Sequence, residues 1–144
     1  MPAIQKEQNI NIIDYESLLK AAQQQVEPQR LLFVFLKASL PKDYEEGEKS
    51  DFDAGQGGAL QAVMCVDKAL EELGSFSDLV KESEKTQQDW QIVLVAGLSG
   101  INDVEPGSSE VERALKMMME TVQNGGDLSK FMAFNKAGEP VQFS

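Results

Sequence analysis

The 144-residue sequence contains no histidine and a single cysteine, Cys65. Histidine has an unperturbed pKa near neutrality and is the usual general base, proton shuttle and transition-metal ligand. Without it, one chain cannot build a Ser-His-Asp or a Cys-His catalytic site. One cysteine also excludes a disulfide within the chain and a two-cysteine redox pair. We therefore expect neither a cofactor nor a metal site, and the chemistry open to an enzyme is narrow.

Basic residues are also scarce. The chain has 24 acidic and 13 basic residues, a formal net charge of -11 and a pI near 4.4. Such a charge repels nucleic acids and anionic membranes, because binding phosphates needs clustered Lys and Arg. The acidity favours solubility, with attraction of a basic partner as the alternative. We expect neither nucleic acid nor a membrane as a partner.

Long apolar runs are scarce as well, and we expect no secretory leader. No stretch approaches the roughly 20 apolar residues that span a bilayer, and the first residues lack the pattern of a signal peptide. Together with the unpaired cysteine, this indicates a reducing cytoplasm. Hydrophobic residues make up 42% and charged residues 26% of the chain, as in soluble globular proteins. We expect one domain over residues 13–144 after a flexible segment at 1–12.

Periodic apolar residues then divide the chain into helices and strands. Asp14, Asp67 and Ser109 have the character of helix N-caps, and Gly74-Ser75 can break the second helix, with Ser75 or Ser77 capping its second part. Residues 31–36 are continuously apolar, which is typical of a central strand covered on both faces. The full expectation is helices over 15–26, 68–88 and 109–124, strands over 31–36, 59–66 and 90–96, and a C-terminal hairpin of 131–134 with 141–143.

Alternation of strands and helices in the middle of the chain implies right-handed crossovers and a parallel core. The closing hairpin would add an antiparallel strand. The sequence therefore predicts an α/β fold with one mixed sheet of about five strands and helices packed on it. An α+β arrangement like that of SseB or of thioredoxin is the alternative.

Residues 39–58 form a long segment that is rich in acids and ends in Gly55-Gln56-Gly57-Gly58. The glycines precede a strand and lack the residues of a phosphate-binding loop, so a flexible loop is the better interpretation. Asp51 and Asp53 do not have the spacing of a calcium loop, which favours solvated acids. Whether the long segment is ordered stays open.

Polar residues also follow the expected strand ends. Parallel sheets bind ligands there, so a small ligand would be held by a rim of Asp67, Gly97, Ser99 and Asn102. Gly97-Leu98-Ser99-Gly100 only superficially resembles a nucleophile elbow, and an ordinary turn is favoured. Cys65 is expected to be a buried apolar residue, although Lys68 leaves a reactive thiol open.

Three segments of the chain carry a resemblance to a known family. They are Glu27-Pro28-Gln29-Arg30-Leu31-Leu32-Phe33-Val34-Phe35, the stretch from Gly57-Gly58-Ala59-Leu60 to Met64-Cys65-Val66-Asp67-Lys68, and Gly138-Glu139-Pro140-Val141-Gln142. They resemble a family of short, uncharacterised proteobacterial proteins, some of which carry the automatic name ribonucleotide reductase alpha subunit. That reaction needs a radical cysteine and a reducing cysteine pair, which this chain lacks. The resemblance supplies no functional residue.

Two hypotheses for the function follow. The first is a cytoplasmic binding or scaffold module that contacts a protein partner or a second copy of itself, with the helix that carries Met117, Met118 and Met119 as part of the contact. The second is a small-molecule-binding protein or a histidine-free enzyme at the strand ends, with Asp67 as base or Cys65 as nucleophile. The narrow choice of titratable groups favours binding.

Overall fold

The computed structural model describes residues 14–39 and 59–142. The predictions for residues 1–12, for most of the 39–58 loop with its glycines and acids, and for the final strand residue at 143 lie outside these ranges. The elements, in chain order, are α2 (Tyr15–Gln23), β1 (Gln29–Ser39), β2 (Ala59–Ala69), the 3-10 turn η1 (Leu70–Glu72), α4 (Phe76–Glu84), β3 (Ile92–Ser99), α5 (Ser108–Gln123), the 3-10 turn η2 (Leu128–Lys130) and β4 (Met132–Asn135).

These strands form one open sheet in the order β2-β1-β3-β4, and all three pairings are antiparallel. The expected α/β class is correct, but the parallel core and the mixed sheet are wrong. The physical reason is the position of β1. The connection through α4 does join two strands of the same direction, β2 and β3, but β1 lies between them and runs against both. This is a split strand-helix-strand unit, so parallel strands never become neighbours.

The expected five strands become four among the described residues, because the closing hairpin is incomplete. After β4 the chain turns at Gly138, whose φ of +83° suits glycine. It then returns with a single bridge between Phe134 and Pro140 and a hydrogen bond from Val141 N to Ala133 O at 2.8 Å. Proline has no N–H for a longer ladder, so the return does not become a strand.

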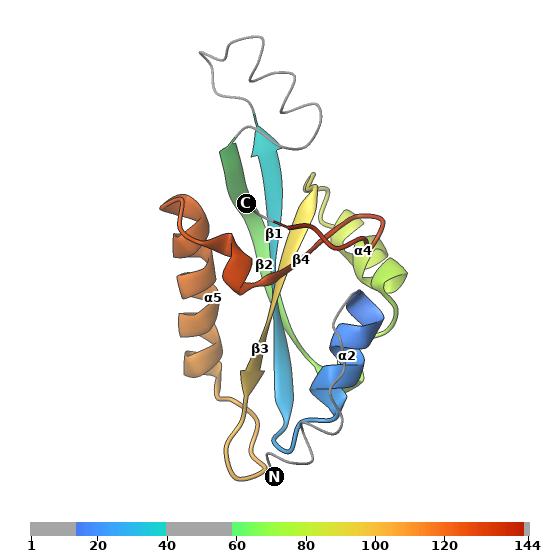
Figure 1. Ribbon diagram of the computed structural model, residues 1–144, viewed down its shortest axis with the longest axis vertical. Coiled ribbons are helices and arrows are strands. Elements are labelled where there is room, and N and C mark those ends of the chain that lie inside the picture. Colours follow the sequence, from blue (N-terminus) through green and yellow to red (C-terminus); the bar gives the residue numbers. More distant parts are fainter. Residues whose placement is uncertain (1–13, 40–58, 143–144) are drawn as a thin grey trace.

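The core lies on both faces of the sheet, as expected for β1, where every side chain from Leu31 to Leu36 is buried. Odd-numbered β1 residues face α2 and α4, and even-numbered residues face α5. Figure 1 shows α2 and α4 together on one side of the strands and α5 on the other. The buried residues on the first side are Tyr15, Leu18, Leu31, Phe33, Phe35, Leu79, Trp90, Val93, Val95 and Phe134. Those on the second are Leu32, Val34, Leu36, Leu94, Val111, Leu115, Met118, Val122 and Ala133.

Two of the expected helix starts are confirmed by their caps. The Asp14 carboxylate accepts a hydrogen bond from Ser17 N at 2.8 Å, and the Ser75 hydroxyl accepts one from Asp78 N at 3.1 Å. Each cap satisfies a backbone N–H that has no partner inside the helix. The helix end at Asn124 is also confirmed.

Other local expectations are wrong. Asp67 and Lys68 do not begin a helix, because they pair with Leu32 and Leu31 and extend β2 to Ala69. The helix in this region is α4 alone. Helix α5 begins one residue before Ser109, with Gly107 as its N-cap, so the predicted capping box does not form. No helix within the described ranges is both long and apolar enough to cross a membrane.

Candidate functional site

The predicted rim residues lie at one end of the sheet, but they are divided between its two faces. Asp67 stands near the end of β2, opposite Leu32, on the face that α5 covers. Gly97 and Ser99 belong to β3 and not to a turn, and they face the α2 and α4 side through their partners Leu31 and Gln29. Asn102 lies in the turn beyond. The sheet end therefore gathers these residues without making one pocket from them.

Arg30 on β1 lies close to three carboxylates at this end of the sheet. Its Nε donates to Asp67 Oδ2, and its Nη1 donates to Glu105 Oε1 at 3.4 Å. Its Nη2 lies 3.7 Å from Glu72 Oε1. The hydrogen bond that Arg30 donates to Asp67 raises the pKa of the guanidinium above its ordinary value. Asp67, proposed from sequence as a base, is therefore held in an ion pair.

The turn after β3 is tied to the segment before β1. Asn102 and Asp103 have φ values of 55° and 63°, and Ile101 and Val104 form a bridge around them, as in the two-residue turn of a hairpin. Both backbone N–H groups of this turn donate to the Glu27 carboxylate, Asn102 at 2.8 Å and Asp103 at 2.9 Å. The two segments thus form one connected tip.

Gly100 makes this close approach possible. Its backbone N–H donates to Pro28 O at 2.8 Å, and a Cβ at this position would stand 1.9 Å from Val104 O. Any larger residue would push the turn away from the strand. The Ser99 hydroxyl adds a further link between the two segments, because it accepts a hydrogen bond from Gln29 Nε2.

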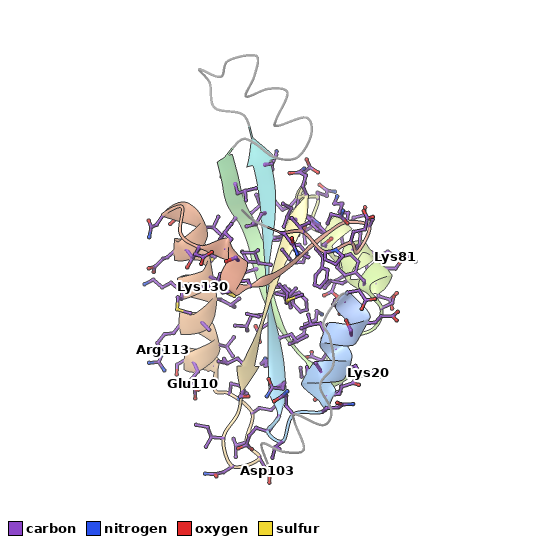
Figure 2. All side chains as sticks on the ribbon, in the orientation of Figure 1. Lys20, Lys81, Asp103, Glu110, Arg113 and Lys130 are labelled. Atoms are coloured by element: carbon purple, nitrogen blue, oxygen red, sulfur yellow. The ribbon has the colours of Figure 1, made fainter. Side chains whose placement is uncertain are left out.

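The tip exposes three large aliphatic side chains. Val26 is 68% exposed, Ile101 67% and Val104 66%. Asp103 lies at the lowest point of the molecule in Figure 2. We define the sheet-end surface as these residues together with the polar groups around them: Val26, Glu27, Arg30, Asp67, Glu72, Ile101, Asn102, Asp103, Val104 and Glu105. Five acids against one arginine make its charge clearly negative.

Cys65 is exposed on β2, so the prediction of a buried residue is wrong. It lies opposite Val34 on β2, which pairs with β1 alone among the described strands. Although the residue is exposed, partial desolvation of the thiol and, to a lesser extent, the nearby Asp67 carboxylate raise the pKa of Cys65. A raised thiol pKa lowers the fraction of reactive thiolate, which disfavours the nucleophile hypothesis.

Other candidate chemistry is sparse. Within residues 14–39 and 59–142, no group of three or more Cys, Asp or Glu side chains is arranged to hold a metal ion. An open hollow of about 450 Å³ lies along the outer face of α5, lined by Ser109, Glu112, Arg113 and Lys116. In Figure 2, the labelled Glu110 and Arg113 point away from the sheet on this helix. The hollow includes none of the predicted rim residues.

Of the residues in the sheet-end surface, the sequence indicated Asp67 and Asn102 but not Glu27, Arg30 or the exposed aliphatic residues. The sequence did carry a signal for the turn, because Asn-Asp between Ile101 and Val104 is close to the favoured hairpin dipeptides. No local signal marks Glu27 and Arg30, since their partners lie 37 to 76 residues away in the chain.

Comparisons of the chain with models of protein families, with curated proteins and with solved structures give no match. The resemblance to the short proteobacterial family therefore stays a prediction.

Proposed function

We propose that this chain is a cytoplasmic protein-binding module and that the sheet-end surface is its contact site. The observation that carries the proposal is that Val26, Ile101 and Val104, each about two-thirds exposed, belong to two segments that internal hydrogen bonds join into one tip. Exposed aliphatic side chains on an ordered surface mark contact sites more often than they serve the isolated chain.

The charge of the surface defines the partner. Glu27, Asp103 and Glu105 border the aliphatic residues, and only Arg30 offsets them. The complementary surface is an apolar patch on another protein with Lys or Arg residues around it. The overall charge of -11 strengthens attraction to such a partner at a distance.

Rigidity supports the same conclusion. The Glu27 carboxylate engages both N–H groups of the turn, and the Gly100 N–H engages Pro28. A surface that is already ordered loses little conformational freedom on binding, so more of the contact energy appears as affinity. The proposal needs no catalytic group, which agrees with the ion-paired Asp67 and the raised pKa of Cys65.

A displayed library of random peptides is a direct test. The library is selected against the full chain, and the enriched peptides are then titrated against a tip variant with Val26→Ser, Ile101→Ser and Val104→Ser. Met117→Ser is the matched control, because Met117 is 59% exposed on α5. We expect apolar peptides with Lys or Arg to be enriched, at least tenfold weaker binding to the tip variant, and loss of affinity as salt rises.

Three results would refute the proposal. One is a selection that enriches no peptide. Another is a set of peptides that bind the tip variant as well as the unchanged chain. The third is a greater loss of binding with Met117→Ser than with the tip variant, which would move the contact to α5.

A further inference from the structure

We infer that the outer edge of β2 pairs with β2 of a second copy of this chain, in antiparallel register, to form a continuous sheet across a two-fold axis. This inference is independent of the sheet-end surface. It rests on the edge that β2 leaves open, on the charge along that strand and on the partial covering of the opposite edge.

The first observation is the open edge. β2 is eleven residues long and pairs only with β1 among the described residues, so one row of its backbone N–H and C=O groups has no strand partner there. Long unpaired edges invite another strand, and natural proteins usually protect them with charges, proline or a covering segment. β2 contains no proline and only two charged residues, and its protection is a bulge at Val63, where the pairing with β1 shifts register.

The second observation is that both charges are already neutralised within the chain. Asp67 pairs with Arg30, and Lys68 Nζ lies 2.8 Å from Glu82 Oε1. The net charge of β2 is therefore zero in a chain of net charge -11. Two copies repel each other over most of their surfaces, but not along this strand, and a β2 contact would bury no unpaired charge.

The third observation concerns the other edge of the sheet. The chain that follows β4 folds back along it, with Asn135 N donating to Glu139 O at 3.0 Å and Val141 N donating to Ala133 O at 2.8 Å. The opposite edge is therefore covered along β4, whereas residues 96–99 of β3 pair with β1 alone, so β2 is the longest open edge among the described residues. Pairing of like edges about a two-fold axis uses the β2 edges of both copies. A second copy is therefore the partner that continues the sheet as a dimer.

In the proposed dimer, Cys65 lies near the two-fold axis. If the pairing is centred on Met64, the middle residue of β2, the two Cys65 residues are offset by two positions along the strands. With a rise of about 3.3 Å per residue and a strand spacing of about 4.8 Å, their Cα atoms lie roughly 8 Å apart. A two-fold axis perpendicular to the sheet keeps both thiols on the same face. The sheet-end surfaces of the two copies then lie at opposite ends of the dimer.

Sedimentation and thiol cross-linking of the full chain test the inference together. We expect a species of twice the 15.9 kDa chain mass that dissociates on dilution. A short bismaleimide should link Cys65 to Cys65 in this species. The variant with Gln61→Glu and Cys65→Glu adds exposed carboxylates to β2 and should shift the dimer midpoint at least tenfold to higher concentration.

The matched control carries Gln88→Glu and Gln123→Glu, which add the same charge at exposed positions away from β2. It should retain the dimer. Circular dichroism and Trp90 fluorescence establish that both variants are folded. A monomer at all concentrations would overturn the inference. So would a dimer that both variants weaken equally, or one in which the two Cys65 thiols cannot be linked.

Discussion

Replacing Ser83 by alanine should destabilise the fold far more than the loss of one surface hydroxyl would. Ser83 is 5% exposed, and its Oγ accepts a hydrogen bond from Trp90 Nε1 at 2.8 Å while donating to Val80 O at 2.6 Å. Trp90 is 1% exposed, and Phe35 packs edge-on against it at 4.9 Å. With Ser83→Ala, the indole N–H stays in the core without an acceptor, because no water can reach it without opening the packing.

The magnitude follows from the desolvation of that donor. Leaving a buried polar group unsatisfied costs about 1–3 kcal/mol, whereas the net value of an ordinary hydrogen bond is nearer 1 kcal/mol. We expect Ser83→Ala to lower the free energy of unfolding by about 2 kcal/mol, which corresponds to a fall of roughly 6 °C in Tm for a chain of this size. Urea unfolding followed by circular dichroism measures the change. The slope with urea should stay constant, since the surface exposed on unfolding is the same.

Tyr15→Phe is the contrasting variant. The Tyr15 hydroxyl is buried and has no hydrogen-bond partner among the described residues, so its removal relieves a desolvation cost. The ring keeps its edge contacts with Phe76 and Phe134 at 5.2 and 6.3 Å. We expect an unchanged or higher free energy of unfolding. If Ser83→Ala is neutral, or if both variants destabilise the chain to the same extent, the account of polar groups in this core is wrong.

Three further predictions follow from the same structure. Burial raises the pKa of Tyr15 to about 12, so the unfolded chain loses this proton first, and stability should fall between pH 10 and 12 by an amount that Tyr15→Phe removes in alkaline unfolding curves. Because partial desolvation and the nearby Asp67 raise the pKa of Cys65, iodoacetamide should label the folded chain at pH 7.5 more slowly than the urea-unfolded chain, and equal rates would contradict the raised pKa. Asp103→Gly should raise the free energy of unfolding by about 0.5–1 kcal/mol in thermal melts, since glycine adopts positive φ without strain, while Asp103→Ala should lower it.

Local sequence patterns predicted the elements that local forces determine. The caps at Asp14 and Ser75 are visible because a short polar side chain precedes each amphipathic run. The strand at 31–36 is visible because both of its faces are buried, which removes every polar residue from it. The buried stripe of α5 is visible for the same reason, from Val111 to Val122 at helical spacing.

Strand neighbours could not be predicted in this way. The pattern of a crossover between parallel strands is present in residues 59–66, 68–88 and 90–96. The two strands of this pattern, β2 and β3, do run in the same direction. No pattern in these segments indicates that β1 lies between β2 and β3. The pairing of β2 with β1 also places Asp67 and Lys68 in a strand, although their local sequence favours the start of a helix. Cys65 is exposed for a related reason, because β2 is an edge strand and not a central one.

The position of β1 also explains why the predicted rim residues do not enclose a site at the sheet end. In a parallel sheet, the carboxyl ends of neighbouring strands leave a crevice in which ligands bind. Here the amino end of β1 enters the space between the carboxyl ends of β2 and β3. Arg30 forms an ion pair with Asp67, and Gln29 donates a hydrogen bond to the Ser99 hydroxyl. The Glu27 carboxylate accepts hydrogen bonds from the N–H groups of the turn. The polar groups that would have lined a crevice are thus bonded to one another. What remains for contact with other molecules is the outside of the tip, where Ile101 and Val104 project beside acids, and this is the surface that the peptide selection tests.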